Sequence, residues 1–166
     1  VRSSTPPGTV NFLSSALRFD VIHNPEFLRE ATALQDFLNP AYILLGISFW
    51  GANAEIIKEL YRPFGVPILL TSSTTSEMIK LATNGFLAAT IAYWMDIDLL
   101  CRSLEVSSHE VGMIASLDPR VPAYGARMHH PYGGRCLPKS IQQLLKIAEE
   151  KLGKPATEKV PVLAGV

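Results

Sequence analysis

The densest group of chemically useful residues in the sequence surrounds a cysteine. Residues 133–140 read Gly-Gly-Arg-Cys-Leu-Pro-Lys-Ser, which places Cys136 just before a predicted helix and beside two cations, Arg135 and Lys139. A helix N-terminus and nearby positive charges both favour the thiolate, the form of cysteine that attacks carbonyl carbon. The two preceding glycines allow a ligand to approach the backbone closely. The pattern predicts a nucleophilic Cys136, and the alternative is a small buried residue of the core, the usual place of a lone cysteine.

Two pairs of polar residues are spaced four apart. Glu26 and Glu30 follow a predicted strand end, where open α/β sheets bind ligands, and this spacing predicts a shared helical face. One carboxylate could activate a water molecule and the other have a structural or cofactor role, whereas the alternative is an ordinary solvated face. Lys80 and Asn84 belong to a predicted long helix, so an ammonium and an amide project together and could stabilise an oxyanion. Alone, this second pair indicates no function.

No metal site is predicted. His129 and His130 are adjacent, but neighbouring histidines rarely bind one ion without a third ligand, and none stands out. Cys101 and Cys136 form neither a CxxC pair nor a Cys/His ligand spacing, and two cysteines are too few for a disulfide framework. We therefore expect a reducing, cytoplasmic environment. Cys101, on the predicted long apolar helix, is expected to have a packing role only.

Short apolar runs alternate with helical segments in the first half of the chain. A turn at 3–9 precedes a helix, residues 26–37 are helical or irregular, and 54–61 repeats apolar residues at helical spacing. The predicted strands are 19–23, 42–47 and 67–71. Strands of this length between helices indicate parallel pairing. The fold predicted here is a partial parallel α/β sheet, a truncated Rossmann-like arrangement.

A mainly helical region with one long central helix is predicted for the second half. Residues 73–76 are rich in N-capping side chains, and 77–104 contains no proline and only Gly85 as a breaker. Apolar residues surround much of this helix, which predicts burial on several sides, including against a second copy of the chain. Shorter helices are predicted at 107–115 and 140–152.

The composition restricts the partners of the protein. The 166 residues include 15 basic and 15 acidic side chains, so the net charge is zero and no basic patch for nucleic acid is expected. The longest apolar run, 85–93, is about half the length needed to cross a bilayer, so no membrane partner is expected either. Hydrophobic residues make up 48%, which predicts a well-filled core in a soluble protein.

Both ends of the sequence suggest a segment of a longer chain. Val1 is not methionine, and it leads into a turn with no signal sequence. At the other end, residues 159–166 form an apolar run that is predicted to be a buried strand.

Five motifs follow one another along nearly the whole chain. They are Ser3-Ser4-Thr5-Pro6-Pro7-Gly8-Thr9, Asn24-Pro25-Glu26-Phe27-Leu28-Arg29-Glu30, the Thr71–Asn84 segment with Lys80-Leu81-Ala82-Thr83-Asn84, Asp118-Pro119-Arg120, and Gly133-Gly134-Arg135-Cys136-Leu137-Pro138-Lys139. In this order they resemble the UDP-glucose/GDP-mannose dehydrogenase family. The resemblance implies three parts: 1–72 as the C-terminal part of a Rossmann-like NAD domain, 73–153 as a helical dimerisation domain with the cysteine loop, and 154–166 as a linker and the first strand of a nucleotide-sugar-binding domain.

The resemblance also implies a reaction and its residues. Enzymes of this family oxidise the C6 alcohol of a nucleotide sugar to a carboxylate and reduce two NAD, with a cysteine that forms a thiohemiacetal and then a thioester. Cys136 would be that nucleophile, Lys80 and Asn84 would stabilise charge on the C6 oxygen, and Glu26 would activate the hydrolytic water, with Ser4 in place of the family's threonine. The residues implied near the substrate are Phe27, Leu28, Gly133 and Arg120. Of these, Arg120 would reach the substrate across a homodimer formed through helix 77–104. The residues implied near the cofactor are Glu30 and Lys139.

The chain departs from the family pattern at several points, of which two bear directly on the chemistry. Ser140 stands where the family has an aspartate that partners the catalytic lysine, and a serine cannot carry that charge. The sequence also contains no GxGxxG turn for a pyrophosphate, so no NAD is expected on this chain alone.

Three interpretations follow from these residues. The first is a part of an NAD-dependent nucleotide-sugar 6-dehydrogenase, inactive by itself, with residues 24–30 compatible with UDP-glucose and with GDP-mannose. The second is an NAD-independent cysteine hydrolase or acyl-transfer enzyme that uses Cys136. The third is a non-catalytic, dimerising remnant.

Overall fold

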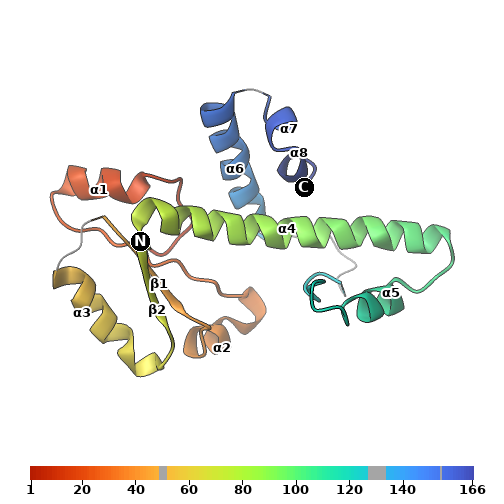
Figure 1. The fold of residues 1–166 in the computed structure, drawn as a ribbon, viewed down its shortest axis with the longest axis horizontal. Coiled ribbons are helices and arrows are strands. Elements are labelled where there is room, and N and C mark those ends of the chain that lie inside the picture. Colours follow the sequence, from red (N-terminus) through yellow and green to blue (C-terminus); the bar gives the residue numbers. More distant parts are fainter. Residues whose placement is uncertain (49–51, 127–133, 154) are drawn as a thin grey trace. The chain divides into compact units, whose positions relative to one another are not determined.

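The computed structural model describes residues 1–48, 52–126, 134–153 and 155–166. The chain forms two compact units, Val1–Leu81 and Ala82–Val166. The long helix α4 (Ser73–Ser103) begins in the first unit and continues into the second (Figure 1). Its 31 residues confirm the prediction of one long central helix.

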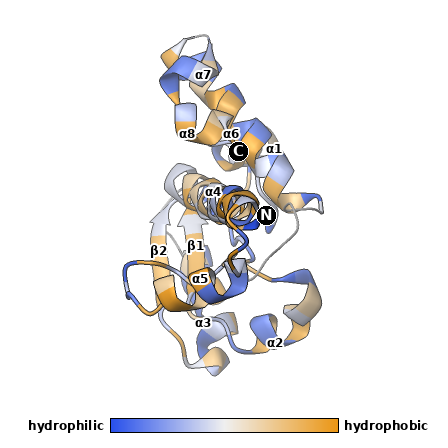
Figure 2. Cartoon of the chain, turned by 90° about the vertical axis from the view of Figure 1, so that its right-hand side faces the viewer, coloured by the Kyte–Doolittle hydropathy of each residue, from blue (hydrophilic) through white to orange (hydrophobic). Residues whose placement is uncertain are grey.

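A small parallel sheet forms the centre of the first unit. Strands β1 (Ile43–Ile47) and β2 (Ile68–Ser72) pair in register, with Ile43 opposite Ile68 and Ile47 opposite Ser72. Every residue of β1 is buried, and the strand is coloured as largely hydrophobic in Figure 2. Helix α3 (Ala52–Tyr61) and the short helix η2 (Arg62–Phe64) connect the strands. This β–α–β connection confirms the predicted parallel sheet.

Three helical segments precede β1 in the chain. Helix α1 (Thr9–Leu17) begins after Gly8, whose φ of 97° is a conformation that glycine adopts without strain. The predicted helical or irregular stretch resolves into an irregular part followed by the 3₁₀ helix η1 (Glu30–Thr32) and helix α2 (Ala33–Leu38). The predicted turn and the helix after it are confirmed.

The strand predicted at 19–23 is wrong. Only His23 is bridged, by two antiparallel hydrogen bonds with Gly46 of 2.8 and 2.7 Å. Val21 instead donates its N–H to the Ser14 hydroxyl at 3.0 Å, and Phe19 is 61% exposed. Because only His23 of this run pairs with β1 and the Val21 N–H has a side-chain partner, the run forms no continuous ladder with a neighbouring strand.

The described residues of the second unit form the remainder of α4 and four further helices. They are α5 (Ser108–Ala115), α6 (Cys136–Leu152), α7 (Ala156–Lys159) and α8 (Pro161–Ala164) (Figure 1). Ser107 caps α5 by accepting the N–H of Glu110 at 3.2 Å, which confirms the predicted start of that helix. Helix α6 begins four residues earlier than predicted, because a proline such as Pro138 is tolerated in a first turn, where its missing N–H has no partner in any case.

Two glycines allow close packing in the second unit. A Cβ atom at Gly85 of α4 would lie 2.9 Å from Leu144 of α6, and one at Gly112 of α5 would lie 2.4 Å from the carbonyl oxygen of Ala126. Cys101 is buried on α4, which confirms its predicted packing role.

The strand predicted at 159–166 is also wrong. Helices α7 and α8 occupy this stretch, with Pro161 in the first turn of α8, where its fixed φ suits a helix. A single apolar run needs a neighbouring strand to satisfy its backbone groups, and the described residues of the second unit contain no strand to supply one. No helix among the described residues is long and apolar enough to cross a membrane.

Candidate active site

Lys80 and Glu26 meet in the first unit, although 54 residues separate them. The Lys80 side chain is only 5% exposed, and its ammonium donates to the main-chain carbonyl of Glu26. The Lys80 Nζ also lies 3.5 Å from Glu26 Oε1 and 4.9 Å from the centre of the Phe27 ring. Burial of a lysine is tolerated only when such partners replace water. The structure thus joins two of the predicted site residues in one ion pair.

The segment after Glu26 is irregular and folds back on its own carboxylate. The Leu28 N–H donates to Glu26 Oε2 at 2.8 Å, and the Phe27 ring packs on Tyr42 with centroids 5.6 Å apart. Glu30 is exposed at the start of η1. Because Glu26 lies outside any helix, the prediction that Glu26 and Glu30 share a helical face is wrong. The Glu26 carboxylate is 29% exposed, and this exposure gives water access to a candidate base.

The loop with Ser4 is attached to α4 by a carboxylate that the sequence did not single out. Glu77, wholly buried, accepts the Gly8 N–H on Oε2 at 2.6 Å, and Oε1 accepts the Val10 N–H at 2.9 Å and the Thr5 hydroxyl at 3.3 Å. Ser4 itself is partly buried. The only available signal for Glu77 was its position in the first turns of the long helix, three residues before Lys80.

His23 is a second buried polar residue that sequence reasoning did not assign. Its Nδ1 lies 2.8 Å from the Ser76 hydroxyl and its Nε2 lies 3.2 Å from the Ser3 carbonyl oxygen. Because a carbonyl only accepts, Nε2 donates to Ser3, and in the neutral imidazole Nδ1 then accepts from the Ser76 hydroxyl. Burial lowers the pKa of His23, with the Ser3 carbonyl and the Glu77 carboxylate opposing this effect.

In the second unit, Asn84 and Ser140 form a buried pair. The Asn84 Nδ2 donates to the Ser140 hydroxyl at 2.9 Å, and Asn84 is 5% exposed while Ser140 is wholly buried. Ser140 lies in the first turn of α6, which begins with the exposed Cys136. The Asn84 amide therefore has a neutral partner at this position. The spacing of four places Cys136 and Ser140 on neighbouring turns of one helix face.

Two further predicted residues of the second unit, Arg120 and Lys139, are exposed. Arg120 forms a bidentate pair with Asp118, with Nη2–Oδ2 and Nε–Oδ1 distances of 2.6 and 3.0 Å. This pairing raises the pKa of Arg120 and lowers that of Asp118. Lys139 is exposed on α6. Gly133, His129 and His130 lie outside the described residues, among which no group of three potential metal ligands occurs.

The fold and these side chains define a class. A parallel β–α–β unit is followed by a long helix with Lys80 and Asn84, and by a helix whose first residue is an exposed cysteine. Models of two domains of one family match the chain: the NAD binding domain over residues 1–65 and the central domain over residues 74–160. The chain belongs to the UDP-glucose/GDP-mannose dehydrogenase family.

Individual relatives support this assignment. The putative UDP-glucose 6-dehydrogenase YtcA of Bacillus subtilis is 33% identical over 90% of this chain and 37% of its own length. The UDP-glucose 6-dehydrogenase TuaD of the same organism is 35% identical over 89% of this chain and 34% of its own. Among solved structures, a UDP-glucose dehydrogenase from Pyrobaculum islandicum superposes with a TM-score of 0.88, at 31% identity over 99% of this chain and 40% of that one.

The chain spans about a third of the length of the curated relatives it matches. The residues present do not fit a complete NAD site, because the sequence contains no glycine-rich turn of the kind that holds a pyrophosphate. Glu30 and Lys139, the residues implied near the cofactor, are both exposed.

Proposed function

We propose that this chain supplies the catalytic cysteine and its surrounding residues to an NAD-dependent dehydrogenase that oxidises the C6 alcohol of a UDP- or GDP-linked sugar to a carboxylate. The observation that carries the proposal is the exposed Cys136 at the first position of α6 in a member of this family. Residues 1–72 belong in this proposal to the NAD domain and residues 73–153 to the central domain.

Cys136 acts in two steps, neither of which transfers a hydride. In the first, the thiolate adds to the aldehyde carbon at C6: the S–C bond forms, the carbonyl π electrons move to oxygen, and that oxygen takes a proton to give a thiohemiacetal. In the last, water adds to the corresponding thioester, the C–S bond breaks, and carboxylate and thiol are released. The oxidations that precede and separate these steps belong to the whole enzyme.

The other polar residues serve these two steps. Lys80 and Asn84 donate hydrogen bonds to the C6 oxygen when it carries charge, and Glu26 takes a proton from the attacking water, with Ser4 beside it. The contact of Lys80 with Glu26, at 3.5 Å, supports a shared role for these two residues. Ser140 leaves Asn84 with a neutral hydroxyl partner, so the amide is held without a negative charge beside it. Phe27, Leu28, Gly133 and Arg120 are proposed to contact the sugar nucleotide.

A chimera tests the activity. Residues 1–166 replace the matched segment of TuaD, and NADH formation from UDP-glucose is followed at 340 nm. We expect activity that Cys136→Ser abolishes, while Cys101→Ser, at the buried cysteine, leaves it within about twofold. A folded chimera that forms no NADH, or one that keeps its activity without Cys136, overturns the proposal.

The isolated chain is expected to bind no NAD. Isothermal titration of the 166-residue protein with NAD should release no heat of binding, because the pyrophosphate turn is missing from its sequence. The matched reference is the same titration of the chimera, which contains the turn. Micromolar affinity of the isolated chain for NAD contradicts this part of the proposal.

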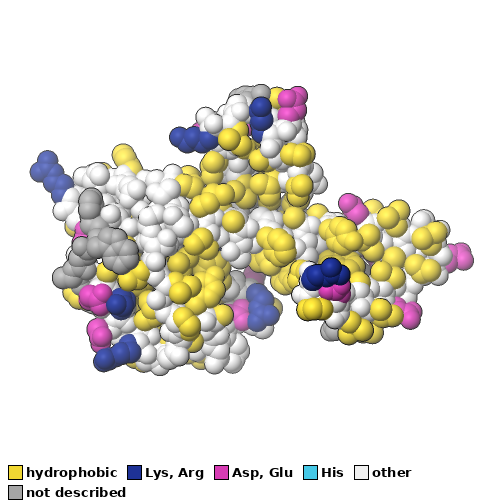
Figure 3. Space-filling model, viewed as in Figure 1, with side chains coloured by type: hydrophobic (Ala, Val, Ile, Leu, Met, Phe, Trp, Pro, Cys, Tyr) yellow, Lys and Arg dark blue, Asp and Glu magenta, His cyan; other side chains and the backbone are white. Residues whose placement is uncertain are grey.

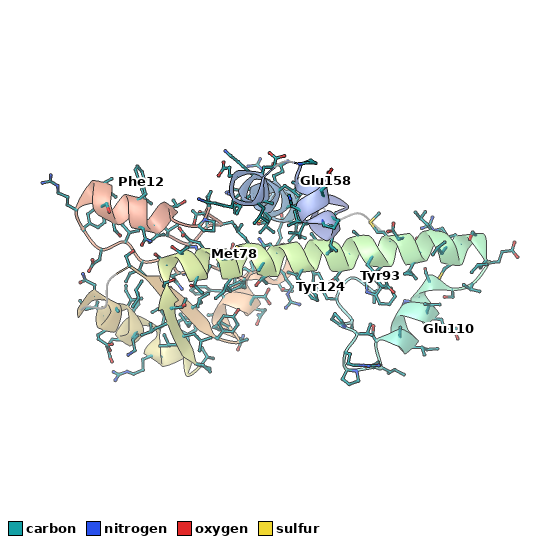
Figure 4. The ribbon with its side chains drawn as sticks, turned by 45° about the horizontal axis from the view of Figure 1, so that its top comes forward. Phe12, Met78, Tyr93, Glu110, Tyr124 and Glu158 are labelled. Atoms are coloured by element: carbon teal, nitrogen blue, oxygen red, sulfur yellow. The ribbon has the colours of Figure 1, made fainter. Side chains whose placement is uncertain are left out.

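We further propose that the partner of the chain is a second copy, bound through helix α4. Large apolar side chains repeat along one side of its second part, and Phe86, Tyr93 and Leu100 are 59%, 58% and 59% exposed. They are seven residues apart, which is the repeat of helices that pack side by side. Figure 4 labels Tyr93 on this helix.

A further inference from the structure

One buried carboxylate of the first unit has no part in the chemistry proposed above. Glu77 accepts three hydrogen bonds from residues 5–10, two of them from the main chain. The N–H groups of Gly8 and Val10 lie at the beginning of α1, where a helix offers them no partner of its own. No side chain of the loop caps α1, so Glu77 takes that role from a distant part of the sequence.

Ser4 lies between two anchored neighbours. On one side, the Ser3 carbonyl accepts from His23, which is in turn held by Ser76. On the other side, the Thr5 hydroxyl donates to Glu77. Ser76 and Glu77, which hold these two neighbours, are consecutive residues of α4. The backbone on both sides of Ser4 is therefore fixed to one point on this helix.

The same turn of α4 holds the candidate base. Lys80 follows Glu77 by three residues, so the two side chains share a face of the helix, and Lys80 contacts the carbonyl and the carboxylate of Glu26. Residues 76–80 thus bind both the Ser4 loop and the Glu26 segment, two parts of the chain that have no regular secondary structure at these positions.

We propose that Glu77 is a positioning residue that sets where the Ser4 hydroxyl lies relative to Lys80 and Glu26. The proposal rests on the proposed function for the roles of those three residues. Its physical basis is the carboxylate geometry: both oxygens accept, and only a residue with two acceptor atoms at this place can hold Thr5, Gly8 and Val10 together.

Hydrogen exchange in the 166-residue chain tests the positioning without any catalysis. Glu77→Gln keeps the shape of the side chain but places its amide N–H against the main-chain N–H of Gly8. The rate of main-chain amide hydrogen exchange at residues 8 and 10 is therefore expected to rise about tenfold or more. The amide resonance of Ser4 is expected to shift. Glu59→Gln, an exposed glutamate of α3, should change neither. Thr5→Val removes one donor from the loop side and should give the same shift at Ser4 if Glu77→Gln does not fold. Unchanged exchange and an unchanged Ser4 signal overturn the proposal.

Kinetics in the TuaD chimera separate positioning from general stability. Glu77→Gln is expected to lower kcat about tenfold or more with KM within about twofold, and Ser4→Ala added to Glu77→Gln should cause little further loss, because the misplaced hydroxyl no longer contributes. Losses that multiply, or a kcat that does not change, contradict the proposal. If the parent chimera is inactive, the proposed function fails, while hydrogen exchange still decides whether Glu77 fixes the loop.

Discussion

The two cysteines of the chain have opposite surroundings. Cys136 is exposed at the first position of α6, whereas Cys101 is 6% exposed within α4. Iodoacetamide should therefore modify Cys136 in the native chain at least about 100-fold faster than Cys101, because a buried thiol reacts only when the structure opens. Intact mass spectrometry with peptide mapping measures both rates.

The Cys136→Ser variant is the control for this alkylation. It should take up no label in the native state and one label in denaturant. Rapid labelling of Cys101 in the folded protein would contradict the packing observed around it.

His23 predicts a pH dependence of stability. Because its pKa is lowered in the folded state, the unfolded chain binds a proton more readily, and protonation favours unfolding. The contribution of His23 is complete above the pKa of unfolded histidine, about 6.5, and declines as the pH falls through and below that value. Urea unfolding at pH 7.5 and 5.0 should show the loss.

A glutamine provides a matched variant of His23. His23→Gln can still accept from Ser76 and donate to the Ser3 carbonyl, yet it does not titrate, so the difference between the two pH values should shrink. His109→Gln, at an exposed histidine of α5, should leave the difference unchanged. An undiminished pH effect in His23→Gln would assign it to other groups.

At the scale of elements, α5 depends on a glycine for its packing. A Cβ at Gly112 would meet the carbonyl oxygen of Ala126 at 2.4 Å, and a main-chain atom cannot move aside as a side-chain end can. Gly112→Ala should lower the free energy of unfolding by about 1–3 kcal/mol, although alanine favours a helix more than glycine does. Glu110→Ala, exposed on the same helix, is the control, and urea unfolding measures both. A stabilised Gly112→Ala variant would contradict the packing.

The elements predicted correctly are those whose sequence signals, apolar periodicity and capping residues, lie within the element itself. The two apolar runs that became β1 and β2, the long proline-free stretch of α4 and the serine cap of α5 were all predicted, because periodicity and capping act within a few residues. The strand predictions at 19–23 and 159–166 were wrong for the same reason. A strand needs a continuous ladder of pairs with a neighbouring strand, and the sequence of a run does not say whether that ladder forms.

The candidate site could be predicted only in part for a similar reason. Cys136, Lys80 and Asn84 belong to motifs with recognisable spacing, whereas Glu77 and His23 act on residues 20–72 positions away along the chain. Their hydrogen-bond partners are main-chain groups and small hydroxyls, which leave no pattern in the sequence. Buried polar networks of this kind become visible only when the tertiary contacts are known.

At the scale of the whole molecule, α4 has two different sides in its second part. Ala88, Ile91, Trp94 and Cys101 are buried, while Phe86, Tyr93 and Leu100 are largely exposed. Figure 3 shows further hydrophobic side chains over α5 and the adjoining stretch of α4. Water contact with such a set of large side chains is unfavourable, and the proposed pairing with the same set on a second copy would give a symmetric, closed interface.

The oligomeric state tests this interface directly. Sedimentation equilibrium at about 10 µM should give twice the mass of the 18.2 kDa chain, since association that buries an apolar helix face is favoured at this concentration. Leu100→Glu places a charge within the exposed stripe of Phe86, Tyr93 and Leu100. We expect it to shift the protein to the monomer, because the charge would have to be desolvated without a partner. Leu34→Glu, at a leucine of α2 that is also largely exposed, should remain dimeric. A wild-type chain that sediments as a clean monomer would leave the α4 stripe without the proposed partner, and dissociation by both variants would place the interface elsewhere.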